Sequence, residues 1–541
     1  MSFVFKKKSR IKSDLVVMQD WMKFHPSTFN FSSASPTSSY YLRLCNRVLK
    51  IILPSDLRED CGSAERAIQL ACILTAYFED TISETGLFRI FTKRHEELYG
   101  KPLPFYYVTE EYYPDEINLN DLYFLAWHAL SLWGKEDEIG LFDPFFRDGD
   151  HITALREIYD LFDSEFETAP QNEDMQQFLH LPPHANVDEI RSLLDFLSSE
   201  YYLGFIEYES FMNTLVEKTE QRVSEAKTEG KDIVEAIRDQ EMIFYDAKVN
   251  HLFNHYTSLL AQRPSEQLAL LVGEEHPLYP LLKSLSTRKL GCFLFIEEKE
   301  TEFIFEHIHS GTRINVSKEY LTIENEQLTP NRSCLSMSLV KWGDTWQQMG
   351  SAILFDHTPG EDSDLPGASL FDNPEERMNL LKEMEKGFLQ VNHGKQIAYL
   401  KDAEELYDLY SRFLDISLPP TEEKEKTKAK QLAGISPILK KQHGHFTLFF
   451  NRVTGIEFYF DEMTTLIADP DNPYYIPGKT YQLELLFFHP NISVEFANYL
   501  IENHKVEFIE SEQCAPALSV LLDNRDFLLR YYKQESYRQE R

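Results

Sequence analysis

The sequence predicts an α+β multidomain protein with a mainly α-helical N-terminal region, a small antiparallel β-barrel or rolled sheet, and a C-terminal α+β unit. Three observations support this class. Apolar residues recur at helical spacing through the first half of the chain, short alternating segments crowd together after position 289, and both patterns mix near the C-terminus. With 541 residues, the chain is long enough for several folding units.

The helical region is the most strongly patterned part of the chain. Helical spacing predicts one helix that begins after Ser63, an N-cap residue, and another over 120–134. Between them, 101–114 is rich in Tyr, Phe and Pro, which predicts an ordered loop because so many rings would not stay solvated. Asn186 and Glu189 have the spacing of a capping box and begin a further helical stretch.

Short strands follow the helices. Three are expected between 290 and 317, where apolar and polar residues alternate. Two more, 334–342 and 345–355, flank Gly343 and Asp344, a pair suited to a two-residue type II′ hairpin. Rolling such a short sheet into a barrel removes its exposed edges, which favours closure.

The last third of the chain mixes helices and strands. Asn373 and Pro374 are suited to cap and begin a helix, and the almost purely charged 419–430 segment is expected to be a linker. Beyond it we expect a hairpin over 445–460, a strand over 481–488, a helix over 494–503 and a strand over 506–510. The expected organisation is an N-terminal arm (1–39), a mainly α-helical domain (40–285), a small β-barrel (286–357), an acidic loop with helices (358–418), the charged linker (419–430) and a C-terminal α+β domain (431–541).

Charge and cysteine content restrict the setting and the partners. The chain holds 54 Lys and Arg against 88 Asp and Glu, a net charge of −34, so it repels nucleic acid and anionic lipid and favours a basic partner protein. Its six cysteines are scattered without CxxC spacing, as expected of reduced thiols in a cytoplasm. Neither a signal peptide nor an apolar stretch of about 20 residues is evident, so we expect no membrane span.

The common catalytic signatures are absent. Gly478-Lys479-Thr480 has the end of a phosphate-binding loop, but Pro473 stands where that motif needs its first glycine. No GxSxG, GxGxxG or HExxH pattern occurs. The sequence therefore identifies neither a catalytic residue nor a cofactor.

Paired histidines are the main candidates for a metal site. His251 and His255 lie four residues apart on an expected helix, so their rings share a face and are candidate ligands of one ion. Zinc proteases need Glu at the next position, which is Leu252 here, and a packing role is the alternative. Two further pairs without an obvious third ligand are His307 with His309, and His443 with His445.

Aromatic residues suggest two other sites. Trp342 and Trp346, on the small barrel, are candidates for a binding platform, with burial in the core as the alternative. If the protein is an enzyme of unrecognised type, its site is expected either at the histidine pair or in the aromatic loop and nearby helices. The loop candidates are Tyr106, Tyr107, Glu110 and Glu111.

Landmarks in the N-terminal half resemble an uncharacterised Bacteroidota protein family, a domain of unknown function. They are Asp20-Trp21, His25-Pro26, Tyr40-Tyr41-Leu42, Leu44, Asn46-Arg47-Val48, the run from Gly100 to Tyr106, Asp121 and Trp127. The resemblance implies a bacterial cytoplasmic setting and transfers no activity to any residue. The leading hypothesis is a noncatalytic interaction or adaptor protein. The alternatives are an unrecognised enzyme, possibly metal-dependent, and nucleic-acid binding through the barrel.

Overall fold

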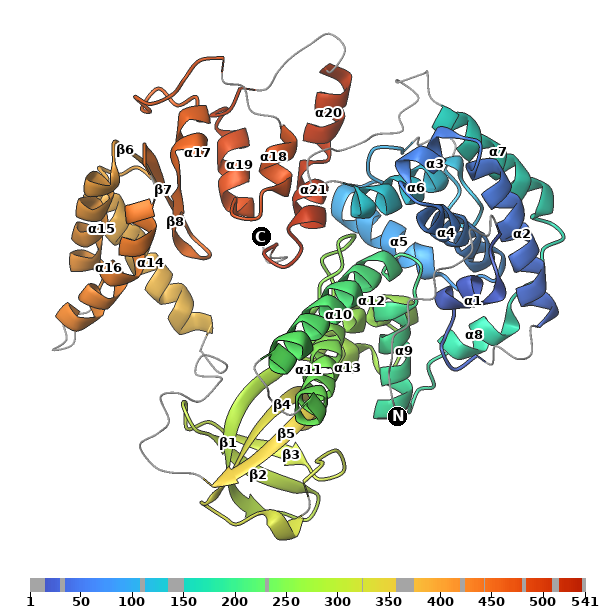
Figure 1. Ribbon diagram of the computed structural model, residues 1–541, viewed down its shortest axis with the longest axis horizontal. Helices are drawn as coiled ribbons and strands as arrows, with labels where there is room; N and C mark the ends of the chain where they lie inside the picture. Colours follow the sequence, from blue (N-terminus) through green and yellow to red (C-terminus); the bar gives the residue numbers. More distant parts are fainter. Residues whose placement is uncertain are drawn as a thin grey trace. The chain divides into compact units, whose positions relative to one another are not determined.

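The protein is divided into two compact units. The computed structural model describes residues 15–29, 35–107, 112–134, 150–228, 233–323, 325–356, 374–418, 424–441, 443–478, 483–507 and 515–537. Unit 1 comprises Met1–Leu370 and Asp523–Glu535, and unit 2 comprises Phe371–Leu522 and Ser536–Arg541. The predicted α+β class is confirmed (Figure 1). The finer domain boundaries expected from the sequence stay predictions.

Unit 1 is built around the helix α4 (Ala64–Ile82), in which 15 of 19 residues are buried. A helix buried on nearly every side is central rather than amphipathic, and its neighbours include α2, α5 and α6. The predicted start is confirmed, since the Ser63 hydroxyl accepts a hydrogen bond from the Arg66 backbone N–H. The first eight helical elements of the unit are α1 (Met18–Trp21), η1 (Met22–Phe24), α2 (Pro36–Ile52), α3 (Asp56–Asp60), α4, α5 (Leu87–Tyr99), α6 (Leu119–Trp133) and α7 (Asp150–Glu165).

The remaining helices of unit 1 lead to its sheet. They are α8 (Glu173–Leu179), α9 (Val187–Ser199), α10 (Phe205–Thr228), α11 (Ile233–Asn254), α12 (Pro264–Val272) and α13 (Tyr279–Ser284). The predicted capping box at Asn186 and Glu189 is confirmed at the start of α9. α10 and α11 run side by side, and α11 contacts the sheet through β5 (Figure 1). The segment expected to be an N-terminal arm contributes to the core, since Trp21 is 0% exposed.

The sheet of unit 1 is rolled. Its strands are β1 (Lys289–Glu298), β2 (Glu302–His307), β3 (Arg313–Ser317), β4 (Ser333–Trp342) and β5 (Thr345–Asp356). They pair in the order β1-β2-β3-β5-β4, and β4 also pairs with β1. The contact that closes the ring is one parallel residue pair, Val316 with Trp346, so rolled sheet describes the fold better than a fully antiparallel barrel. The predicted two-residue turn is confirmed, with Gly343 at φ 62° between paired Trp342 and Thr345.

The last helix of the chain, α21 (Arg525–Tyr532), packs into unit 1. Phe527 and Tyr531 are each 1% exposed. The Phe527 ring lies 5.9 Å from that of Trp127 and 5.6 Å from that of Phe105, centroid to centroid. The Asn524 side chain accepts a hydrogen bond of 2.8 Å from the Lys101 ammonium. Unit 1 is therefore completed by a segment that the main part of unit 2, Phe371–Leu522, separates from the rest of unit 1 in the sequence.

Unit 2 combines helices with a small antiparallel sheet. Its elements are α14 (Pro374–Val391), β6 (Ile397–Leu400), α15 (Ala403–Ser417), α16 (Lys424–Lys441), β7 (Phe446–Asn451), β8 (Gly455–Tyr459), α17 (Asp461–Leu466), α18 (Leu483–Phe488), α19 (Val494–Glu502) and α20 (Ala515–Asp523), which ends at the boundary with unit 1. The sheet order is β6-β7-β8. Phe388, Phe413 and Leu448 lie in one hydrophobic cluster that joins α14 and α15 to the sheet.

One sequence prediction in unit 2 is wrong. Of the strand expected over 481–488, residues 483–488 form α18, because a short continuous apolar run has no period that separates a buried strand from a buried helix, and 481–482 lie outside the described residues. The expected charged linker 419–430 is helical from Lys424 onward, since Lys, Glu and Ala all have high helix propensity, and its role as a linker stays a prediction. The ammonium of Lys424 also donates to the Asp415 carbonyl at the end of α15. Of the strand expected over 506–510, residues 506 and 507 are not in a strand and 508–510 lie outside the described residues.

Candidate functional site

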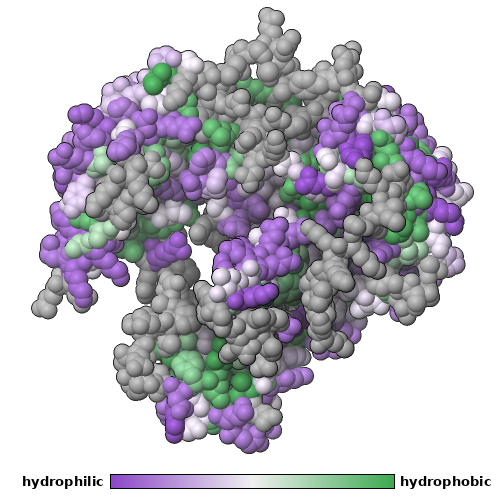
Figure 2. Space-filling view, viewed as in Figure 1, coloured by the Kyte–Doolittle hydropathy of each residue, from purple (hydrophilic) through white to green (hydrophobic). Residues whose placement is uncertain are grey.

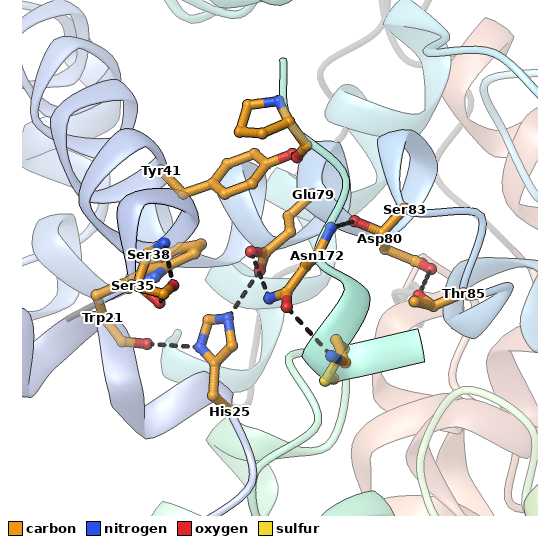
Figure 3. Close-up of polar contacts among 12 residues, drawn as sticks. Trp21, His25, Ser35, Ser38, Tyr41, Glu79, Asp80, Ser83, Thr85 and Asn172 are labelled. Atoms are coloured by element: carbon orange, nitrogen blue, oxygen red, sulfur yellow. Dashed lines mark hydrogen bonds and ion pairs between the residues drawn. The ribbon is translucent and has the colours of Figure 1, made fainter. Parts of the chain in front are cut away.

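A group of polar contacts in the core of unit 1 surrounds Glu79 on α4, which is 5% exposed (Figure 3). His25 Nε2 lies 2.7 Å from one Glu79 carboxylate oxygen, and Asn172 Nδ2 donates to the other at 3.0 Å. The Ser83 hydroxyl, one turn further along the chain, accepts from the Asn172 backbone N–H at 2.9 Å. We call His25, Glu79, Ser83 and Asn172 the Glu79 cluster.

Local structure places each member of the Glu79 cluster. His25 ends the short helix η1, and its Nδ1 lies 3.2 Å from the Trp21 carbonyl, one helical turn earlier. Asn172 is the N-cap of α8, where its side-chain oxygen accepts from the Met175 N–H. The cluster therefore joins three segments that are far apart in the sequence. His25 lies 54 residues before Glu79, and Asn172 lies 93 residues after it.

The Glu79 carboxylate favours the protonated form of His25. Burial lowers the pKa of the imidazole, but the charge of Glu79 and its hydrogen bond act in the opposite direction, and the pKa is raised above its ordinary value. Glu200 adds to this effect at longer range and is itself held by the Ser27 backbone N–H. Because the Trp21 carbonyl and the Glu79 carboxylate are both acceptors, the surroundings of His25 favour an imidazolium that donates from both ring nitrogens.

A second buried acid, Asp80, fixes the start of α5. Its carboxylate accepts from the backbone N–H groups of Leu87 and Phe88, at 3.0 and 2.7 Å, and from the Tyr202 hydroxyl at 2.9 Å. A negative charge is favoured at a helix N-terminus, where N–H groups lack partners. Burial nevertheless outweighs these hydrogen bonds and raises the pKa of Asp80.

A third acid, Asp121 on α6, accepts from the Tyr77 hydroxyl at 2.6 Å. Burial raises its pKa to about 7, although hydrogen bonds from Tyr77, Tyr112 and Asn118 lower it. Gln69, Tyr77, Glu79 and Asp80 all project from α4, each toward a different neighbouring segment. These polar contacts give the central helix one orientation relative to its neighbours, because an unpaired buried polar group is costly.

The chemistry of the Glu79 cluster is limited by its burial. A carboxylate beside an imidazole is a common acid–base pair, but His25 is 2% and Glu79 5% exposed. Both oxygens of Glu79 and both nitrogens of His25 have partners within the core. In this arrangement the cluster locks helices together, and proton transfer to a substrate would need the core to open.

The structure brings the predicted metal ligands His251 and His255 together. Their rings stack 4.2 Å apart at 15°, and Phe211 stacks on the other side of His251 at 4.4 Å. His255 Nε2 lies 2.9 Å from a carboxylate oxygen of Glu207. Since imidazole lone pairs lie in the ring plane, two nearly parallel rings do not aim them at one ion, and a shared metal needs another rotamer. The metal role stays a prediction.

We expect His251→Phe to weaken the acid sensitivity of folding. Burial, followed by the charge of His255, lowers the pKa of His251 to about 3, so below pH 6.5 the unfolded chain takes up a proton that the folded chain refuses. Wild type should lose up to about 3 kcal/mol of unfolding free energy from this group between pH 7 and pH 4. The variant keeps the ring stack and loses the titrating nitrogen. Urea unfolding of wild type and His251→Phe at pH 7 and pH 4 tests this, with the neighbouring His255, Glu207 and Tyr208 left unchanged. If both proteins lost the same unfolding free energy between the two pH values, the prediction would be contradicted.

The two predicted platform residues lie at one end of the rolled sheet. Trp342 pairs with Thr345 and Trp346 pairs with Lys341 in the β4–β5 ladder. Because paired residues share a face and neighbours alternate, the two tryptophans point to opposite faces. Trp342 is 9% exposed, and the Lys289 ammonium lies 6.0 Å from the Trp346 ring centre. A common platform is therefore not formed by this pair, and a binding role for either residue stays a prediction.

The remaining candidates are dispersed. Tyr106 is 5% exposed and Tyr107 half-buried in the predicted ordered loop, while Glu110 and Glu111 lie outside the described residues. Within the described ranges, no group of three or more His, Cys, Asp or Glu side chains is arranged to hold a metal ion. None of the helices in those ranges combines the length and the apolar character needed to cross a bilayer.

Sequence reasoning missed the Glu79 cluster. His25 was noted only as a landmark, and Glu79 and Asn172 have no spacing that would group them with it. The one available signal was composition, because Glu79 and Asp80 follow a largely apolar stretch of the helix and a buried acid needs a partner.

Comparison with known proteins identifies a family, but no activity is assigned to that family. A family model described as "Protein of unknown function (DUF3843)" matches residues 16–287. That stretch includes the Glu79 cluster and ends just before the rolled sheet begins. No curated protein matches the chain. No solved structure matches it either. Because the family model covers half of the sequence, the chain belongs to the DUF3843 family of proteins of unknown function.

Proposed function

We propose that the protein is a noncatalytic cytoplasmic interaction protein that binds a basic partner protein where α11 meets the rolled sheet. The observation that carries this proposal is a group of exposed large apolar side chains at that junction. They are Met242 (39% exposed), Tyr245 (46%), Leu290 (44%) and Ile353 (51%), which we call the junction surface.

One carboxylate makes several contacts across the junction. Asp246 on α11 accepts from the Arg288 guanidinium at 2.7 Å, and from the Ser351 backbone N–H and hydroxyl at 2.9 and 2.6 Å. Gly350 lies so close that an added Cβ would stand 2.5 Å from the Asp246 oxygen, and its φ of +126° also excludes most side chains. The residues of the junction surface lie within four positions of Asp246, Arg288 or Ser351, so this contact positions them.

Two members of the junction surface share the outer face of the sheet. Leu290 pairs with Ser338 and Ile353 pairs with Ser336, two positions apart on β4. Paired residues share a face, as do residues two apart on a strand, so both apolar side chains point the same way. Figure 2 shows hydrophobic atoms gathered on the rolled sheet at the bottom of the view. Apolar groups collected on one exposed surface are typical of interaction sites.

Charge favours a basic partner. The chain has a net charge of −34, which attracts cations and repels phosphate backbones over several ångströms. Exposed acids also lie on the elements that carry the junction surface: Glu241 on α11, Glu297 and Glu298 on β1, and Asp356 on β5. An apolar centre with acidic neighbours is complementary to a partner that presents an apolar patch among lysines and arginines.

The test compares two variants of the full chain purified from its own host at low salt. Leu290→Asp with Ile353→Asp should weaken binding of a stoichiometric basic partner at least tenfold, because burying a charge at such a surface costs more than about 1.4 kcal/mol. Leu380→Asp on α14 is the matched control, since Leu380 is 54% exposed but lies in unit 2. A partner that is retained equally by both variants, or replaced by stoichiometric nucleic acid or metal, would overturn the proposal.

A further inference from the structure

Four of the described cysteines lie in two pairs, although nothing in their sequence spacing suggests it. Cys45 on α2 and Cys72 on α4 have sulfur atoms 3.7 Å apart. Cys292 on β1 and Cys334 on β4 are also in contact, because the Cys334 thiol donates a hydrogen bond to the Cys292 sulfur. None of the four is in a disulfide, and all four side chains are buried in the folded protein.

The strand register brings Cys292 and Cys334 together. Cys292 pairs with Ser336, and Leu294 pairs with Cys334, so the two cysteines are diagonal neighbours on adjacent antiparallel strands. Diagonal neighbours share a face of the sheet. Here that face is the outer one, which also carries Leu290 and Ile353.

The two pairs differ in electrostatic surroundings. The hydrogen bond from Cys334 has the largest effect on the Cys292 thiol and lowers its pKa. Burial raises the pKa and a hydrogen bond from Ser336 lowers it, so that the pKa is about 7. Burial in the helical core raises the pKa of Cys72 well above its ordinary value, and burial also raises the pKa of the unpaired Cys61 to about 12. Only a thiolate is an effective nucleophile, so the lower pKa favours the sheet pair, whose two thiols the strand register places on one face of adjacent strands.

We propose that Cys292 and Cys334 form a reversible disulfide in the rolled sheet, with Cys292 as the thiol that first reacts with a hydroperoxide. This assignment is independent of the proposed partner. It gives the protein a thiol modification site next to, but not within, the junction surface.

The oxidation of Cys292 and Cys334 takes place in two displacement steps. The Cys292 thiolate attacks one peroxide oxygen, the O–O bond breaks, and the leaving hydroxide takes up the thiol proton as water, which leaves a sulfenic acid. The Cys334 thiol then attacks the sulfenic sulfur, the S–O bond breaks, and a second water departs as the S–S bond forms. Two electrons pass from the thiols to the peroxide, and an added dithiol reverses the change.

Peptide mass mapping of the full chain after graded hydrogen peroxide at pH 7 tests the proposal. We expect a linked peptide pair containing Cys292 and Cys334, 2 Da lighter than the two thiols, that dithiothreitol restores. Cys45, Cys61 and Cys72 are internal controls because, like Cys292 and Cys334, they are 0% exposed, so a difference in reactivity does not come from exposure. From thiolate fraction and nucleophilicity, Cys292 should react on the order of 100 times faster than Cys61.

The Cys334→Ser variant distinguishes a disulfide-forming pair from a single reactive thiol at Cys292. In that variant Cys292 should be trapped as a sulfenic acid by dimedone, and no internal disulfide should form. Oxidation of Cys292 in wild type without a link to Cys334, or oxidation of Cys292 no faster than that of Cys61, would overturn the assignment. Both decisive measurements use the wild-type protein, so they hold even if the variant folds poorly.

Discussion

Phe527→Ala is expected to lower the unfolding free energy of unit 1 by about 3–5 kcal/mol, the usual cost of removing a buried phenyl ring. Phe527 is 1% exposed, and aromatic rings surround it. They belong to Phe91, His95, Phe105, Phe124, Trp127 and Tyr531. All five tryptophans of the chain lie in unit 1, so tryptophan fluorescence during urea unfolding reports on that unit alone.

Phe413→Ala is the matched control for this prediction. Phe413 is also 1% exposed, but it belongs to the core of unit 2, so its loss should leave the tryptophan transition in place. Deleting the chain after Leu522 should have a larger effect than Phe527→Ala, because it removes the whole of α21 from unit 1. A Phe527→Ala protein that unfolds at the wild-type urea concentration would show that α21 does not complete unit 1.

His25→Ala is expected to destabilise unit 1 by about 3–5 kcal/mol, because it leaves the Glu79 carboxylate buried without its counter-ion. Adding Glu79→Gln should recover part of that loss, since a neutral amide is less costly to bury than an uncompensated charge. The same fluorescence measurement applies, with the coupling between the two sites taken from the double-mutant cycle.

The His25 effect should also depend on pH. The folded pKa of His25 is raised above its unfolded value, so the ion pair stabilises the fold fully below about pH 6.5 and less as pH rises through the folded pKa. The cost of His25→Ala should therefore shrink between pH 6 and pH 9. A cost that is constant over this range, or no coupling between His25 and Glu79, would contradict the ion pair.

Local signals in the sequence determined much of the secondary structure. Ser63 starts α4, Asn186 and Glu189 start α9, and Gly343 turns β4 into β5, because each acts on backbone groups within four residues. The rolled sheet followed from alternation in the same way. Where the local signal was ambiguous, as at α18, the prediction was wrong.

Only the tertiary structure decided which distant residues meet. Glu79 and His25 are 54 residues apart, and Cys292 and Cys334 meet through a strand register. α21 joins a unit whose main part ends at Leu370, before Phe371–Leu522 of unit 2. The hydrophobic effect that buries Phe527 is non-directional, so the sequence determined that this ring is buried but not against what. Hydrogen bonds and strand register determine which residues meet, and both form only once the helices and strands have packed.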